Sequence, residues 1–181
     1  MRQERGLTLI ELMIGIGLMA LLLSMAVPAL DIFTSNARQT GAVNDFVASM
    51  HVARSTAVTT NSRVTVCPSD NGQRCAAVSW DQGWIVFADP NSNQVVDADE
   101  TIVSSGNRID GLTIDSDEFG AFVTYRPNGR VMNASVNGSV GQFTVCDGRG
   151  SSHAKMMIID LSGRPRFSEY QIDGSTPSCG S

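Results

Sequence analysis

The chain of 181 residues carries 13 lysines and arginines against 18 aspartates and glutamates, which gives a net charge of −5. This acidic balance excludes a globally basic protein, and the length leaves room for one domain with its own core. The charge is uneven, however. Ten acids face two arginines between residues 68 and 118, whereas six basic residues face three acids between residues 119 and 172. A local basic patch in the C-terminal half is therefore compatible with the acidic total.

The first predicted element is an apolar run from Leu7 to Leu30 that contains one charged residue, Glu11. As a helix, these 24 residues would span ~36 Å, enough to cross a bilayer core of about 30 Å. Arg2 and Arg5 precede the run, and positive flanking charge favours a cytoplasmic N-terminus. A secretory signal peptide is the alternative, but its apolar region is shorter and ends at a small-residue cleavage site. We therefore expect a retained single-pass anchor.

Glu11 is unusual because a carboxylate inside a membrane segment costs about 2.5–3.5 kcal/mol, so that it indicates a function. The motif Gly6-Leu7-Thr8-Leu9-Ile10-Glu11-Leu12 resembles the processing and assembly motif of type IV pilins and of the pseudopilins of type II secretion. The resemblance implies that a prepilin peptidase cuts between Gly6 and Leu7 and that the new amine of Leu7 is methylated. It also implies that Glu11 faces the amine of a neighbouring subunit in a filament, an attraction that apolar surroundings strengthen.

The predicted helix continues beyond Pro28, which lacks an amide hydrogen and should kink or locally melt it. Pilins commonly carry a proline here, and the resemblance implies a bend that is important for packing. Apolar residues recur at helical spacing as far as Ala57, so we expect one helix from about 7 to 59. The predicted organisation is a leader (1–6), a transmembrane and assembly helix (7–30), the amphipathic half of the helix (31–60) and a head (61–181).

In the head, apolar and polar residues alternate over short stretches, which predicts β-strands instead of a helix, and turn residues separate these stretches. Pro127-Asn128-Gly129 predicts a hairpin turn, in which glycine supplies a positive φ. About seven strands after one helix indicate an α+β pilin fold, in which an antiparallel β head packs on the second half of the helix. The strands that we predict cover 63–67, 84–87, 122–125, 141–146, 156–160 and 164–167.

Two further motifs narrow the family. The stretch from Trp80 to Asp89 contains Trp80-Asp81-Gln82-Gly83-Trp84, which closely resembles the W-x-x-G-W strand of the FimT/GspH branch of the pilins. Ala53-Arg54-Ser55-Thr56-Ala57-Val58 resembles the end of the helix in the same branch, although Glu often stands at the position of Thr56 there. With the N-terminal motif, the resemblance covers nearly the whole chain.

Four cysteines in an exported domain predict two disulfides, for which three pairings exist. Cys67 and Cys75 enclose seven residues, a length that suits a local hairpin. We therefore favour Cys67–Cys75 with Cys146–Cys179, which would fix the C-terminal tail. Zinc is the alternative, but paired C-x-x-C units are absent from the sequence, which has only two histidines.

An acidic segment after the second predicted strand aligns with the twelve-residue calcium loop of EF-hands. Gln94 stands where that loop needs glycine, and no flanking helices are predicted. We therefore expect an ordinary acidic loop and no cofactor, and a calcium site is the alternative. The oxygen ligands would be Asp89, Asn91, Asn93, Asp97 and Glu100.

The functional hypothesis rests on Gly163-Arg164-Pro165-Arg166. Arginines two residues apart on an extended segment project to the same side, and each guanidinium can bind phosphate oxygens in a bidentate manner. FimT-like proteins that serve DNA uptake carry a Gly-Arg-x-Arg motif in this region, so the resemblance implies binding of double-stranded DNA through Arg164 and Arg166. Gly163, Arg149 and Lys155 are weaker candidates, followed by Arg126 and Arg130. Two solvated surface arginines are the alternative.

The sequence lacks a nucleophile elbow, a metal-binding helix motif and a phosphate-binding loop, so we do not expect an enzyme. We predict a minor type IV pilin that is inserted in the inner membrane with its head in the periplasm and then assembled with other pilins, at or near the tip of an extracellular pilus. DNA capture for natural transformation is its predicted role. The alternatives are a minor pilin that primes assembly without binding DNA, and a GspH-like minor pseudopilin of type II secretion.

Overall fold

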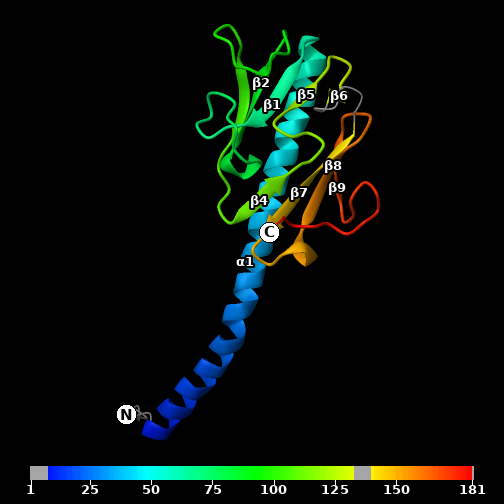
Figure 1. The fold of residues 1–181 in the computed structure, drawn as a ribbon. Coiled ribbons are helices and arrows are strands. Elements are labelled where there is room, and N and C mark those ends of the chain that lie inside the picture. Colours follow the sequence, from blue (N-terminus) through cyan, green and yellow to red (C-terminus); the bar gives the residue numbers. More distant parts are fainter. Residues whose placement is uncertain (1–7, 133–139, 181) are drawn as a thin grey trace. The chain divides into compact units, whose positions relative to one another are not determined.

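The computed structural model describes residues 8–132 and 140–180, and it opens with one long helix, α1 (Leu9–Thr60). The chain forms two compact units, Met1–Arg38 and Gln39–Ser181, and α1 contributes to both (Figure 1). In the described part of the first unit, α1 is long and apolar enough to cross a membrane. Its large apolar side chains between Leu9 and Val27 are exposed, as expected for a segment that packs against lipid or other helices. The helical assignment continues through Pro28, so the predicted local melting is not observed.

The second unit contains two antiparallel sheets, whereas the sequence indicated only one. Sheet A has the strand order β3-β2-β1-β5-β6, and sheet B has the order β4-β7-β8-β9 (Figure 1). Two short 3-10 helices, η1 (Trp80–Gln82) and η2 (Ser151–His153), precede β2 and β8. The strands are β1 (Val64–Pro68), β2 (Trp84–Ala88), β3 (Ile102–Gly106), β4 (Leu112–Asp115), β5 (Val123–Tyr125), β6 (Val131–Met132), β7 (Gly141–Asp147), β8 (Lys155–Ile159) and β9 (Pro165–Ser168).

The six predicted strands are present, and three others were missed. β3 was missed because serines and glycine end it, and its pairing with β2 stabilises a sequence of low strand preference. β4 does alternate between buried and exposed residues, but it is four residues long and lies in the acidic middle of the chain. β6 has two residues, too few to show any period.

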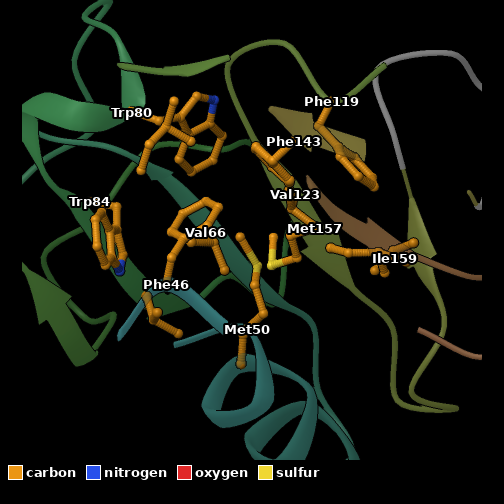
Figure 2. Close-up of a cluster of buried hydrophobic side chains, with 14 of the residues drawn as sticks. Phe46, Met50, Val66, Trp80, Trp84, Phe119, Val123, Phe143, Met157 and Ile159 are labelled. Atoms are coloured by element: carbon orange, nitrogen blue, oxygen red, sulfur yellow. The ribbon is translucent and has the colours of Figure 1, made fainter. Parts of the chain in front are cut away.

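The core lies where the second half of α1 meets both sheets. Phe46 is fully buried at its centre, with its ring centroid 4.9 Å from those of Trp84 and Phe143 and 5.5 Å from that of Trp80. All three pairs are edge-to-face, the geometry that aromatic quadrupoles prefer (Figure 2). Helical spacing places Met50 on the same face of α1 as Phe46, and strands of both sheets contribute most of the other apolar residues of the core. The two motif tryptophans are therefore core residues that fix sheet A against α1.

Both predicted disulfides are present. Cys67–Cys75 closes a loop beside a small second core on the outer face of sheet A, where Ile85 and Phe87 are buried. Cys146–Cys179 links the end of β7 to the C-terminal tail. The tail is thereby tied to sheet B, as expected.

Candidate nucleic-acid interface

The Arg-Pro-Arg segment lies at the edge of sheet B. Among the described strands β9 pairs with β8 alone, with Pro165 opposite Ile159 and Arg166 opposite Ile158. Proline is tolerated as the first residue of an edge strand, because its missing amide hydrogen breaks no ladder bond. Pro165 is buried whereas Arg164 and Arg166 are exposed, so the two guanidinium groups share the solvent side of the segment. The predicted projection of the pair is confirmed.

The turn before β9 is held by Asp160. Its carboxylate accepts hydrogen bonds from the Ser162 hydroxyl (2.5 Å), the Ser162 amide (2.8 Å) and the Arg164 amide (3.3 Å). Gly163, with φ at 73°, donates to the Asp160 carbonyl. These contacts lower the pKa of Asp160. The hydrogen bond from the Ser162 hydroxyl has the largest effect, followed by the two amides and the charge of Arg166. The Asp160 carboxylate is therefore ionised at neutral pH and is engaged by the amides of its own turn.

A second turn, from sheet A, lies against this one. Pro127-Asn128-Gly129 forms the predicted β5–β6 hairpin turn, with Gly129 at φ 76° donating to the Arg126 carbonyl (2.8 Å). Arg130 Nε donates to the Leu161 carbonyl at 3.0 Å, which joins the two turns. A Cβ atom on Gly163 would lie 2.0 Å from the Gly129 carbonyl oxygen, so the backbones approach too closely for any side chain there. Gly163 is thus a packing residue of the motif.

Arginines gather around the two turns. Arg63 and Arg126 line one surface hollow of about 480 Å³ with Pro127, and Arg54 reaches both turns from α1. The two ion pairs found in the described part of the chain, Arg108–Asp110 and Arg149–Asp147, involve none of these residues. We call this surface the basic end. It consists of Arg54, Arg63, Arg126, Arg130, Arg164 and Arg166.

Two of the weaker candidates lie elsewhere. Arg149 binds Asp147 through Nε (2.8 Å) and Nη2 (2.5 Å), and this contact lowers the pKa of Asp147. Lys155 donates to the Thr40 hydroxyl at 2.6 Å and begins β8, three residues before the partner of Arg166. At ~3.3 Å per residue, that places the two backbones ~10 Å apart along the strand. Arg149 and Lys155 are therefore separate from the basic end.

The assembly residues are described in part. The cleavage site between Gly6 and Leu7 lies outside the described residues. Glu11 accepts hydrogen bonds from the Thr8 amide (2.9 Å) and hydroxyl (2.8 Å), while its own amide donates to that hydroxyl (3.3 Å). This is a capping box, which the spacing Thr8-x-x-Glu11 signals and which our sequence analysis overlooked. In the single subunit, Glu11 therefore closes the start of its own helix.

The acidic loop makes its own hydrogen bonds. Asp97 accepts from the side-chain amides of Asn91 and Asn93, both at 2.9 Å, while buried Asp89 binds the Thr65 hydroxyl and two loop amides. Burial, followed by the surrounding carboxylates, raises the pKa of Glu100. No group of three or more His, Cys, Asp or Glu side chains within residues 8–132 and 140–180 is arranged to hold a metal ion. Calcium binding stays an untested alternative, which a rise in melting temperature with millimolar calcium would support.

Comparison with known families decides the class of protein. The family model for type II transport protein GspH matches residues 42–163, about two thirds of the chain. The chain belongs to the GspH family. A model of the prokaryotic N-terminal methylation motif matches residues 1–27, which agrees with the apolar start of α1. The GspH match ends at Gly163, so family membership carries no information about Arg164 and Arg166.

Solved structures show the same fold. Two crystal forms of the type IV minor pilin FimU of Pseudomonas aeruginosa match this GspH-family chain. The first has 18% identity and a TM-score of 0.60 and covers 82% of this chain and 99% of FimU. The second has 17% identity and a TM-score of 0.58, with 78% and 99% covered. Curated protein sequences give no match. The protein is thus a member of the GspH family with the fold of FimU, and its first helix is long and apolar enough to cross a membrane.

Proposed function

We propose that this protein is a minor type IV pilin whose basic end binds double-stranded DNA for natural transformation. The observation that carries the proposal is the exposed pair Arg164 and Arg166, held by a rigid turn directly beside Arg130. Prepilin peptidase would release the chain at Leu7, and the assembly machinery would insert it among other pilins, at or near the pilus tip. The inner-membrane protein would then become extracellular, with a structural rather than a catalytic role.

The mode of binding follows from the side chains. Guanidinium groups form charge-assisted, bidentate hydrogen bonds with phosphate oxygens, and such contacts carry no sequence information. The described helices are α1 and two single-turn 3-10 helices, so the described chain offers no recognition helix for the major groove. Binding should therefore be independent of sequence and weaken steeply as salt rises, because each neutralised phosphate releases about 0.9 counterion.

The test uses the full-length protein in detergent, titrated with labelled double-stranded DNA at several salt concentrations. Arg164→Ala and Arg166→Ala should each weaken binding about tenfold, since a hydrogen bond to a charged group contributes about 1.5 kcal/mol. Each should also reduce the salt slope by about 0.9. Arg74→Ala is the matched control. Arg74 is exposed and lies in the loop after the C-terminal end of β1, whereas Arg63 of the basic end precedes the N-terminal end of that strand. Equal affinity of all three variants and the wild type would refute DNA binding by this segment.

The second candidate is a subunit that acts by contact with other proteins, either priming pilus assembly or serving type II secretion. It is favoured by the family itself, whose description is type II transport and whose matched region stops before the arginine pair. The two candidates differ in cells. Under the DNA hypothesis, cells with the double variant at Arg164 and Arg166 lose transformation but keep normal pili. If deletion of the whole protein abolishes pili or secretion while the double variant still transforms normally, the second candidate is favoured.

A further inference from the structure

Arg54 connects the two turns of the basic end to the helix. It lies on α1, partly buried, and its Nε is 3.2 Å from the Gly129 carbonyl oxygen and 3.3 Å from the Ser162 carbonyl oxygen. The first carbonyl belongs to the β5–β6 turn of sheet A and the second to the β8–β9 turn of sheet B. One N–H group is therefore shared between turns that come from different sheets.

The two glycines make this arrangement sterically strict. A Cβ atom on Gly129 would lie 3.1 Å from Nη2 of Arg54, and one on Gly163 would lie 2.0 Å from the Gly129 carbonyl oxygen. The guanidinium group, the first turn and the second turn are thus stacked in van der Waals contact. Arg130 adds a second link, through its 3.0 Å hydrogen bond to Leu161. The segment that precedes Arg164 is consequently fixed relative to α1 and to sheet A, and not only to its own strand.

We propose that Arg54 is the positioning residue for the Arg164 and Arg166 pair, an inference that rests on the proposed function. Its Nε hydrogen is already bound to two backbone carbonyls, so its role is to hold the turn and not to contact phosphate through that group. A binding group contributes most when its support is rigid, because looseness adds an entropic cost that binding must offset. Arg54 restricts the conformational freedom of the β8–β9 turn, which directly precedes Arg164.

Substitution by lysine separates positioning from charge. Arg54→Lys keeps the positive charge, but a lysine ammonium lacks the planar guanidinium that packs on Gly129. We expect Arg54→Lys and Arg54→Ala of the full-length protein in detergent to weaken DNA binding by a similar factor, about three- to tenfold, with the salt slope unchanged. If lysine restores the affinity, or if alanine reduces the slope by about 0.9, Arg54 contacts phosphate directly and the proposal is wrong.

A second measurement is independent of DNA. The amides of Gly163 and Arg164 are bonded within the turn, to the Asp160 carbonyl and carboxylate. Their hydrogen exchange should be faster in Arg54→Lys than in the wild type, while exchange in β7 should be the same. Unchanged exchange in the turn overturns the positioning role even if the wild type binds DNA. If exchange in the turn is faster in Arg54→Lys but the wild type does not bind DNA, the proposed function is refuted while the positioning of the turn by Arg54 still holds. The two failures are therefore distinguishable.

Discussion

Replacement of Gly163 by alanine probes the contact between the two turns, and Gly72 supplies a matched control. Both glycines have nearly the same backbone angle, φ 73° and φ 69°. A Cβ atom on Gly72 meets nothing within 4 Å, whereas one on Gly163 lies 2.0 Å from the carbonyl oxygen of Gly129 and 3.1 Å from its carbonyl carbon. The two variants therefore share the conformational penalty and differ in the clash.

The magnitude follows from these two effects. Alanine at positive φ costs about 1–2 kcal/mol, and the loss of glycine's freedom in the unfolded chain offsets about 0.4–1 kcal/mol of this in both variants. Gly72→Ala should therefore destabilise by about 1 kcal/mol. In Gly163→Ala the obstructing atom is backbone, so a turn must move, and overpacking adds about 1–3 kcal/mol. For a chain of this size the additional loss corresponds to a melting temperature ~2–12 °C below that of Gly72→Ala.

The assay is thermal unfolding of the oxidised full-length protein in detergent, followed by circular dichroism. DNA affinity of the same samples, measured well below the transition, should fall for Gly163→Ala and stay at the wild-type value for Gly72→Ala. Equal melting temperatures of the two variants would show that the turns are not in contact, and the packing described for the basic end would be refuted.

Three further predictions concern the core, the disulfides and pH. Phe46→Ala should cost about 3–5 kcal/mol in the free energy of unfolding, while Val52→Ala, at a partly exposed position of the same helix, should cost under about 1 kcal/mol; similar values would contradict the aromatic core. Removal of the Cys146–Cys179 disulfide, whose cysteines are 33 residues apart, should lower the free energy of unfolding by about 3.7 kcal/mol, whereas removal of Cys67–Cys75, whose cysteines are 8 residues apart, should lower it by about 2.5 kcal/mol. The reason is that the larger loop loses more chain entropy in the unfolded state, and the reverse order in denaturant titrations would contradict this explanation. Because the folded pKa of Asp160 lies below its ordinary 3.8, its contribution to stability is present above about pH 4 and is lost as the pH falls through the folded pKa. The melting temperature of the wild type should thus exceed that of Asp160→Asn from pH 5 to 8 and converge with it once the pH falls below the folded pKa, whereas a constant difference would contradict the ionised turn.

The elements that the sequence predicted were those with local signals. An apolar run, helical spacing beyond it and the local alternation of Val64-Thr65-Val66 or Phe143-Thr144-Val145 each require no knowledge of distant residues. The cysteine pairing was also predictable, because a short loop limited the choices. The separation into two sheets was not, since β3 and β6 exist through their partners and not through their own preferences.

In the candidate site, too, local features were predictable from the sequence and tertiary contacts were not. The projection of Arg164 and Arg166 followed from strand geometry, because alternation is a local property. Their neighbours did not, because Arg54 and Arg130 reach the segment through tertiary contacts across 108 and 31 residues. Arg149 lies closer in sequence to the pair than Arg54 does, yet it binds Asp147 at the other end of sheet B. Three motifs that the sequence presented separately, at residues 53–58, 127–129 and 163–166, meet at one place in the fold.

The disulfide between Cys146 and Cys179 has a mechanical consequence. β8, β9 and both exposed arginines lie inside the covalent ring that it closes. In the described part of the chain, edge strand β9 is bonded to β8 alone, so a pull on Arg164 and Arg166 would act first on the β8–β9 ladder. Once that ladder parted, extension would be limited to the chain between Cys146 and Cys179, and the load would then pass through the disulfide into β7. Under the proposed function, a force on bound DNA would therefore reach the sheet through a covalent link, and unfolding of the residues after Cys179 would not lengthen that path.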